Sequence, residues 1–571
     1  GVIQEPDPTG NSGFNLVGTN IVFSSAPTNG HAFFGIIYAT ADYLNAGGTF
    51  PDGSTGSPSI TFSNDTDTGL IRPGSGSIGF ISNSTQIANI DGNGLTVSDK
   101  DATINSITVG KGANSVAGNT VLGENALDAG VSGGNNVAVG TQALTTLTSA
   151  TNNTGIGRQA LYSTTTGGFN TGIGDRSLFT NSTGIQNTAV GSVALYANTT
   201  ANNNTAVGFN SLVSNTTGTP NTAVGASALD ANTTGNNNVC IGAGSLGLNT
   251  TGSQNVAVGT ALWSNTTASN NTAVGYNSLG ANTTGHSNTA VGVNALDANT
   301  TAGSNTAIGK NALGANTTGD VNTAVGTSSL LLNTTASSNT AVGGGSMFYN
   351  TTGSQNTAVG RDSLYSNTTG IYNVALGYQA LYLNTEGNNN IAVGWRSLDS
   401  NTTANDNIAI GKSALQANTT GTQNVAVGSL ALDANTTSGK NTAIGHGSLG
   451  SNTGEQNTAV GRFALGNNSS ASNNVAVGFN ALLENTTGTD NVAVGSQALD
   501  ANTTASNNTA IGDVSLSACT TGADNTAVGA SSLGSMTTAN FNTAIGTRAL
   551  NGLTTGSGHC AVGEDALLVA T

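Results

Sequence analysis

Residues 204–220 read N-T-A-V-G-F-N-S-L-V-S-N-T-T-G-T-P, and variants of this 17-residue unit fill the chain from about residue 119 onward. The glycine that follows Val, Ile or Leu recurs 27 times between Gly123 and Gly563. Self-similarity at a fixed short period is the signature of a repeat architecture. Two steps are 16 residues long instead of 17, from Gly259 to Gly275 and from Gly445 to Gly461.

Four positions around each repeat glycine are nearly invariant. Asn stands four residues before it, Ala two before, Val or Ile one before, and Leu four after. The run Asn-Thr-Ala-Val alternates, so Thr and Val share one face of an extended segment and Ala takes the other. We predict a strand of four or five residues that ends at the glycine, and a second short strand with a turn in Leu-x-x-Asn-Thr-Thr. No window carries the 3.6-residue apolar period of a helix.

A single unit cannot bury its own apolar side chains, whereas a stack of identical units can, because each strand pairs with the next copy. Stacking places like residues over one another, and asparagine amides can then hydrogen bond along the stack. The Ala position must stay small because it faces either the coil interior or a neighbouring chain. At about 4.8 Å per coil, the repeats make a rod of roughly 130 Å. Residues assigned to these structural ladders include Asn136, Asn204, Gly140, Gly208, Leu144 and Leu212.

The composition excludes several classes of protein. Charged residues are 7% of the 571 residues, and the net charge is −16. Twelve scattered Lys and Arg cannot form the basic face that a nucleic-acid binder needs, so we expect no nucleic-acid partner. No run of 18 apolar residues is present, so we expect no membrane insertion. The cysteines form no metal-binding spacing, and we interpret them as small apolar residues tolerated in the repeat: Cys240, Cys519 and Cys560.

The unit N-T-A-V-G-x-x-[SA]-L resembles the N-S-V-A-I-G-x-x-[SA] coil of trimeric autotransporter adhesin heads. Residues 106–123, S-I-T-V-G-K-G-A-N-S-V-A-G-N-T-V-L-G, are even more similar to that coil. The resemblance implies a parallel β-roll in which three chains assemble around one axis. We therefore expect a parallel homotrimer, also because one coil has little to bury beyond Val or Ile, Ala and Leu. A monomeric β-solenoid is the competing form.

A second resemblance lies upstream. Residues 58–80, P-S-I-T-F-S-N-D-T-D-T-G-L-I-R-P-G-S-G-S-I-G-F, and residues 87–95, I-A-N-I-D-G-N-G-L, are similar to the connector of bacteriophage tail fibres, especially those of marine and cyanobacterial phages. Residues 1–38 are similar to a small β-domain near the front of many such fibres. That motif usually continues further upstream, so we expect the chain to be cut at its N-terminus. It also stops inside a repeat, at Thr571.

These observations predict an all-β fibrous protein in four parts. Residues 1–50 form a partial N-terminal β-domain, 51–105 a β connector, 106–118 a transition, and 119–571 a parallel β-roll or β-solenoid of 27 repeats. The expected function is structural, as the shaft of a viral tail fibre on the virion that carries a receptor-binding tip to the host. The alternative is a bacterial or other extracellular surface adhesin or filament subunit. Expected partners are further copies of the chain, other tail or fibre proteins at its N-terminal end, and a host surface glycan or receptor.

Candidate chemistry is sparse, and we expect no enzyme, cofactor or metal. Polysaccharide hydrolases need paired carboxylates. The repeat aspartates share the position five residues after the glycine but lie four or more coils apart: Asp230, Asp297, Asp433 and Asp500.

Two further patterns contain residues that can bind metals but lack the full set of ligands. Asp65 and Asp67 in N-D-T-D-T-G lack the other ligands of a calcium loop, so we interpret that segment as a turn. The histidines are isolated from one another along the sequence: His31, His286, His446 and His559.

Aromatic residues occupy the position five residues after the glycine in two sets of three consecutive units, so stacked coils would align each trio. One interpretation is a strip on which sugars stack, and the competing one, which we favour, is aromatic stacking in the core or between chains. Exposure of all six rings would support the sugar interpretation, and burial would exclude it. The six residues are Tyr162, Phe179, Tyr196, Phe348, Tyr365 and Tyr382.

Asn-Thr-Thr recurs in most units and matches the sequon for N-glycosylation. We interpret it as a turn with a polar ladder. A glycan on Asn198, Asn215 or Asn232 would reverse that interpretation.

Overall fold

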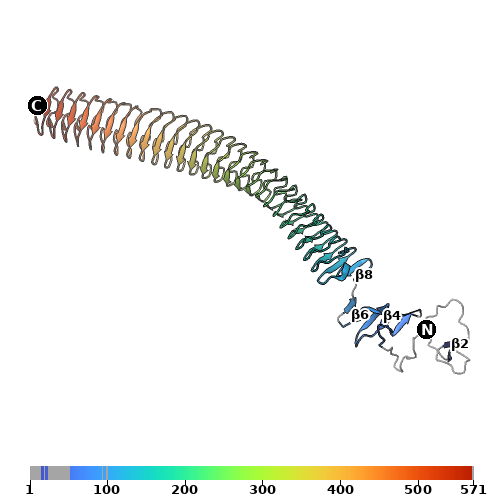
Figure 1. Ribbon diagram of the computed structural model, residues 1–571. Coiled ribbons are helices and arrows are strands. Elements are labelled where there is room, and N and C mark those ends of the chain that lie inside the picture. The colour runs from blue at the N-terminus through green and yellow to red at the C-terminus, as the bar shows by residue number, and fades with distance from the viewer. Residues whose placement is uncertain are drawn as a thin grey trace. The chain divides into compact units, whose positions relative to one another are not determined.

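The computed structural model describes residues 14–17, 20–23, 52–62, 64–92, 94–97 and 101–568. Within these residues the protein is all-β, and its single helix is the short 3-10 turn Ala113–Ser115. The chain divides into two compact units, residues 1–111 and 112–571, and the division falls inside the expected 106–118 transition. Figure 1 shows the second unit as a long stack of thin coils.

The first unit consists of short antiparallel strands. Strands β1 and β2 pair with each other, β3 to β7 form a five-stranded sheet in chain order, and β8 pairs with β9. The buried hydrophobic side chains described in this unit are Ile71 and Ile81. The strands are β1 (Phe14–Val17), β2 (Asn20–Phe23), β3 (Ile60–Phe62), β4 (Asp65–Ile71), β5 (Ile78–Ser82), β6 (Thr85–Asp91), β7 (Gly94–Val97), β8 (Ala102–Ile104) and β9 (Ile107–Gly110).

The turn predicted for N-D-T-D-T-G is wrong. Asp65 and Asp67 both lie in β4. The hydroxyl of Ser84 donates a hydrogen bond to the Asp67 carboxylate at 3.2 Å. Because side chains alternate between the two faces of a strand, Asp65 and Asp67 lie on the same face of β4. Of the predicted 1–50 domain, only β1 and β2 lie among the described residues, and His31 lies outside them.

The second unit contains one strand of three or four residues in each repeat. Each strand pairs in parallel with the next strand along the chain. The strands are β10 (Thr120–Gly123), β11 (Val137–Val139), β12 (Thr154–Ile156), β13 (Thr171–Ile173), β14 (Thr188–Val190), β15 (Thr205–Val207), β16 (Thr222–Val224), β17 (Val239–Ile241), β18 (Val256–Val258), β19 (Thr272–Val274), β20 (Thr289–Val291), β21 (Thr306–Ile308), β22 (Thr323–Val325), β23 (Thr340–Val342), β24 (Thr357–Val359), β25 (Val374–Leu376), β26 (Ile391–Val393), β27 (Ile408–Ile410), β28 (Val425–Val427), β29 (Thr442–Ile444), β30 (Thr458–Val460), β31 (Val475–Val477), β32 (Val492–Val494), β33 (Thr509–Ile511), β34 (Thr526–Val528), β35 (Thr543–Ile545) and β36 (Cys560–Val562).

The register of the stack places like residues over one another. Between β15 and β16, for example, Thr205 pairs with Thr222, and Ala206 and Val207 pair with their equivalents one repeat on. The chain is therefore a β-solenoid whose coils advance by one strand spacing, about 4.8 Å. The predicted parallel stack is confirmed.

The predicted second strand in Leu-x-x-Asn-Thr-Thr is wrong, because that segment is a series of turns in the described repeats. Counting the repeat glycine as position 0, the residue at position +2 and the leucine at position +4 both have positive φ, as in Asn210 (62°) and Leu212 (50°). A strand needs negative φ at every residue, so these left-handed residues bend the chain instead. The turns still hydrogen bond from coil to coil, since the Leu212 amide donates to the Ala228 carbonyl at 3.0 Å.

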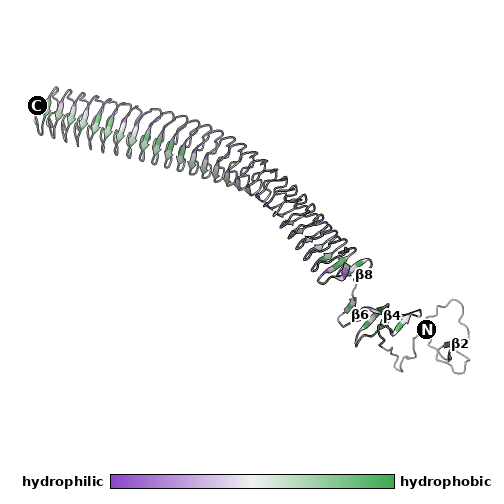
Figure 2. Cartoon of the chain, in the orientation of Figure 1, coloured by the Kyte–Doolittle hydropathy of each residue, from purple (hydrophilic) through white to green (hydrophobic). Residues whose placement is uncertain are grey.

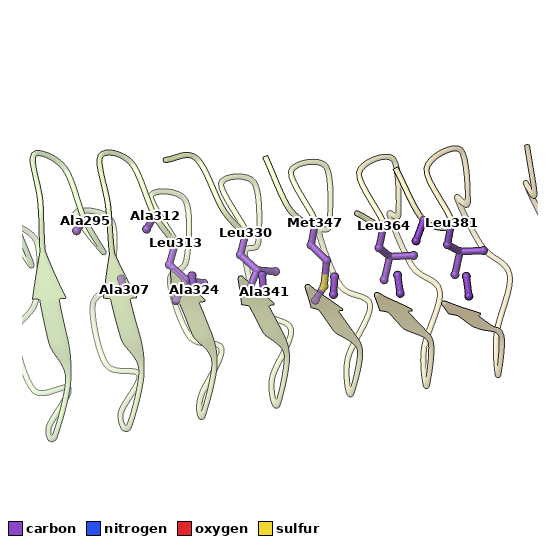
Figure 3. Packing of buried hydrophobic residues seen from close by; sticks show 14 of the residues in the cluster. Ala295, Ala307, Ala312, Leu313, Ala324, Leu330, Ala341, Met347, Leu364 and Leu381 are labelled. Atoms are coloured by element: carbon purple, nitrogen blue, oxygen red, sulfur yellow. The ribbon is translucent and has the colours of Figure 1, made fainter. Parts of the chain in front are cut away.

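The core of the solenoid lies inside a single chain. The strand alanine and the turn leucine are fully buried in nearly every coil, as in Ala206 and Leu212, and Leu567 in the last coil is exposed. Figure 3 shows Leu313, Leu330 and Met347 reaching from the turns toward the strands. A left-handed backbone costs about 1–2 kcal/mol per residue. Burial of a leucine side chain contributes about 1.5–3 kcal/mol, so the buried contact outweighs the strain.

The repeat glycine is required for two separate reasons. Gly208 has a φ of 135°, a region that L side chains rarely adopt. A Cβ atom at Gly208 would also lie 2.5 Å from the carbonyl oxygen of Gly225 in the next coil. The same close approach recurs at Gly140, where the nearest atom is the oxygen of Gly157. The glycine column therefore lets neighbouring coils pack backbone against backbone.

Candidate functional site

The asparagine that recurs at position −4 forms a continuous ladder inside the stack. The Asn204 amide N–H donates to the side-chain oxygen of Asn187 at 3.0 Å, and the Asn221 amide donates in turn to Asn204 at 2.8 Å. The Asn204 side-chain nitrogen donates to the Gly218 carbonyl at 3.0 Å. All of these groups are buried, so each asparagine pairs backbone atoms that would otherwise lose their solvation.

The same bonds hold Asn136 near the first coils. Its amide donates to the Asn119 side chain at 2.8 Å, and its side-chain oxygen accepts the Asn153 amide at 2.9 Å. At the other end His559 replaces the asparagine, and its amide still donates to the Asn542 side chain. His559 therefore keeps the backbone donor of the ladder but has no side-chain oxygen to act as the next acceptor.

The asparagine of Asn-Thr-Thr, at position +7, forms a second buried ladder. The Asn215 side-chain nitrogen donates to the Asn198 side-chain oxygen at 3.2 Å and to the Gly218 carbonyl at 3.1 Å. The Asn232 nitrogen donates to Asn215 in the same way, at 2.9 Å. These three sequon nitrogens are fully buried and hydrogen-bonded, so the folded coil leaves no room for a glycan on them.

Interruptions of the second ladder coincide with sequence changes. In the short repeat that ends at Gly461, the Asn452 side-chain nitrogen donates to the Gly454 carbonyl. The side-chain oxygen of Asn435, in the preceding coil, is left without a partner. Further along, Cys519 takes the asparagine position and donates to the Gly522 carbonyl, which leaves the oxygen of Asn502 unpaired. The ladder is directional, because each side-chain oxygen needs a donor from the following coil.

The other 16-residue repeat loses its residue at a different corner. Leu262 follows Gly259 by three residues instead of four, and φ at Gly259 falls to 95°. The asparagine ladder continues across this repeat, since Asn265 donates to Asn249 at 2.9 Å. A single deletion is therefore absorbed in the turn next to it.

The aromatic trios form two stacks whose rings are all half-buried. Tyr162 and Phe179 have ring centroids 5.1 Å apart, and Phe179 and Tyr196 are 5.0 Å apart and nearly parallel. The second trio is similar, with separations of 5.3 Å between Phe348 and Tyr365 and 5.2 Å between Tyr365 and Tyr382. Both faces of each central ring are occupied by its neighbours. This geometry favours the stacking interpretation over the sugar-binding one.

Six aspartates lie at position +5, and Asp399 is only two coils before Asp433. Partial burial raises the pKa of Asp230, Asp297, Asp433 and Asp500 above the ordinary value. The structure brings no two of these four carboxylates together, because they occupy coils that are not adjacent.

The buried cysteines fill positions of the repeat. Cys240 takes the place of a strand alanine, and burial raises the pKa of its thiol. Burial also raises the pKa of Cys519, to about 11. Cys560 is exposed. Across the described residues, no three His, Cys, Asp or Glu side chains are grouped so that they could hold a metal ion.

Two surface features of the solenoid were missed in the sequence. The first is the strand face that points outward, formed by positions −3 and −1. Position −1 carries only Val, Ile or Leu in every coil, and many of these side chains are substantially exposed, among them Ile241, Ile308 and Leu376. Figure 2 colours many of these strands green, the hydrophobic end of its scale. The signal in the sequence was an aliphatic residue that never becomes polar.

The second feature is a row at position +1, directly after the repeat glycine. Across eight successive coils this row holds basic or aromatic residues at every position except Ser429, and we call it the 361–479 strip. Its members are Arg361, Tyr378, Trp395, Lys412, Ser429, His446, Arg462 and Phe479. The signal was the 17-residue spacing of residues that look scattered when the sequence is read linearly.

No helix in the described part of the chain has the length and apolarity needed to cross a membrane. No protein-family model, curated protein or solved structure matches the chain. The two ladders and the two surface rows are therefore the features from which we infer a function.

Proposed function

We propose that the chain is the structural shaft of a fibre, and specifically of a bacteriophage tail fibre that carries a receptor-binding tip to the host surface. The observation that carries the proposal is the uninterrupted stack of strands from β10 to β36. Stacked coils that contact only their neighbours convert sequence length into reach. The front of the chain supports the phage assignment through its similarity to tail-fibre connectors at residues 58–80 and 87–95.

A shaft has to resist bending and local unfolding. The hydrogen bonds in the interior of the solenoid contribute to both kinds of resistance. Every coil is tied to the next by strand pairing and by the asparagine ladder at position −4. Because these groups are buried, breaking one coil leaves donors and acceptors of its neighbours unpaired, which costs about 1–3 kcal/mol for each group. Rigidity in this proposal comes from hydrogen bonds along the axis.

We also propose that the shaft assembles as a parallel homotrimer through the outward strand face. The face is an apolar row as long as the solenoid, and contiguous exposed apolar surface of that extent is typical of interaction sites. A partner that covers it must keep the same axial repeat over all the coils. A further copy of the chain in parallel has that repeat.

The experiment that tests the shaft assignment is immunogold electron microscopy of the source material with an antibody against the repeat. We expect label along fibres that project from phage tails. Label on cell surfaces or on free filaments without capsids would overturn the phage assignment.

That second outcome would support the other candidate function, a subunit of a cellular surface adhesin or extracellular filament. The repeat itself favours this candidate, since it resembles the coil of trimeric autotransporter adhesin heads. Both functions use the same β-solenoid, so the location of the label separates them.

A further inference from the structure

We infer that the 361–479 strip is a binding surface for a linear anionic polysaccharide that lies along the axis of the solenoid. The inference rests on the exposed surface of the solenoid and does not depend on the tail-fibre assignment. The strip concentrates cations on a chain whose net charge is −16. Of the twelve Lys and Arg, three lie in the strip itself, at Arg361, Lys412 and Arg462, and Arg396 lies next to it.

The cations of the strip contact its aromatic rings. The Arg361 guanidinium lies 5.9 Å from the ring centroid of Tyr378. Lys412 and Arg396 each lie 5.5 Å from the Trp395 ring. Cations within about 6 Å of a ring interact favourably with it. The strip thus offers charge and apolar ring surface at the same places.

The C-terminal half of the strip repeats this arrangement. Arg462 lies 4.8 Å from the ring of Phe463 and 6.0 Å from that of Phe479. His446 makes an edge contact with Phe463 at 5.3 Å. Among the described residues no two rings of the strip stack on each other, whereas the rings of the trios cover one another. Ring surface in the strip therefore stays available to a ligand.

Not all of these charges are neutralised within the chain. Asp362 pairs with Arg361 at 3.2 Å, and Asp399 pairs with Arg396 at 2.8 Å. No ion pair involves Lys412 or Arg462 among the described residues. Two cations in the middle and at the end of the strip are thus available to acidic groups on a ligand.

The spacing of the charges selects the ligand. The strip spans seven coil steps, about 34 Å at the strand spacing. Counting Arg396 beside it, this leaves one Lys or Arg for about every 9 Å. A nucleic acid carries a phosphate roughly every 3.4 Å on each strand, which is too dense for this row. A polysaccharide with carboxylates on some of its sugars has sparser charge. Its sugar rings also have apolar faces that pack against aromatic side chains.

The chain contains its own reporter for this binding. It has two tryptophans, and only Trp395 lies in the strip. Trp263 lies on a distant coil and is similarly exposed, 48% against 44% for Trp395. The variant Trp263→Phe therefore leaves a fluorophore in the strip, and Trp395→Phe leaves one outside it.

The experiment titrates both variants of the full chain with polygalacturonate and, separately, with neutral dextran of matched length. We expect polygalacturonate to change the fluorescence of the Trp263→Phe variant and to leave that of the Trp395→Phe variant unchanged. Dextran should change neither. The response should disappear at about 1 M salt, where the screening length falls to about 3 Å. An equal response to dextran, a response of Trp263, or none at Trp395 would overturn the proposal.

Charge variants provide the matched comparison. In the Trp263→Phe background, the double substitution Lys412→Ser and Arg462→Ser should weaken binding at least tenfold. Lys310→Ser, at position +1 of a coil outside the strip, should change it less than twofold. Lys412→Arg with Arg462→Lys should restore most of the affinity, which a folding defect would not allow. Equal losses in the strip and control variants, or tighter binding of an oligo-dT strand, would contradict the assignment.

Discussion

At the scale of single residues, the fold depends on positions where one side chain is allowed. The repeat glycine combines a left-handed backbone with a close approach to the next coil, so no other residue satisfies both conditions. The turn leucine is the opposite case, because it accepts an unfavourable φ in return for burial. A sequence pattern shows that both residues recur, but it does not show that a leucine is left-handed. This is why the second strand was predicted wrongly.

The glycine column yields a stability prediction. Gly208→Ala should lower the free energy of unfolding by at least 1–3 kcal/mol, because strain in the left-handed region alone costs that much and the new Cβ meets the Gly225 carbonyl. Gly244→Asn is the matched control, since Gly244 lies at position +2, has a φ of 64°, and has open space around its Cβ position. Denaturant titration should show a loss for Gly208→Ala and little change for the control. Equal effects would contradict the packing described here.

The repeat aspartates predict how stability depends on pH. Partial burial raises the pKa of Asp230 above its ordinary value of 3.8, so the folded chain holds this proton more tightly than the unfolded chain does. Stability should therefore fall as pH rises through the window between these two pKa values, and the penalty should be complete above it. Asp230→Asn should stabilise the protein at neutral pH, with a gain that disappears below the ordinary pKa.

The measurement is a series of thermal unfolding curves from pH 3 to pH 7. Asp513→Asn provides the comparison, because Asp513 is an exposed aspartate of the same solenoid. An Asp230→Asn variant that is less stable than the natural chain at neutral pH would contradict the assigned burial.

At the scale of the element, one coil is a strand, a set of turns and two asparagine contacts. The alternation in Asn-Thr-Ala-Val predicted the strand and the inward face of the alanine, since a period of two has only one register with Ala inside. The ladder at position −4 also followed from stacking. The directionality of the second ladder could not be predicted. It is visible only where the next coil supplies no donor, as at the side-chain oxygens of Asn435 and Asn502.

The second ladder predicts a graded response to the same substitution. Asn333→Leu removes the acceptor for Asn350 and the donor to Asn316, so it disturbs a neighbour on each side. Asn435→Leu disturbs the preceding coil at Asn418 but not the following one, because the Asn435 oxygen has no partner to lose. Both variants also lose one bond within their own coil, to the Ala336 or the Ser438 carbonyl. Each buried group left unpaired costs about 1–3 kcal/mol, so Asn333→Leu should destabilise by about that much more than Asn435→Leu. Hydrogen exchange of the affected coils measures the difference, and the reverse order would contradict the ladder.

At the scale of the whole molecule, period and composition predicted a stacked all-β solenoid, which the structure confirms. One coil buries more in a single chain than its few apolar residues suggested, because Ala206, Leu212 and their equivalents are fully buried there. The case for a trimer now rests on the outward Val and Ile row. The surface rows could not be predicted from the composition, since Trp395 and Lys412 become neighbours only when residues 17 apart are stacked.

Electron microscopy of the purified chain, combined with its native mass in the same sample, tests both the solenoid and the trimer. We expect rods with a solenoid of roughly 130 Å at the strand spacing, and a mass three times the 55.9 kDa of one chain. Replacing Val207, Val325 and Val427 with lysine on the outward face should leave the rods intact and reduce the mass to that of one chain. Compact particles would contradict the solenoid, and a single-chain mass for the natural sequence would contradict the trimeric shaft.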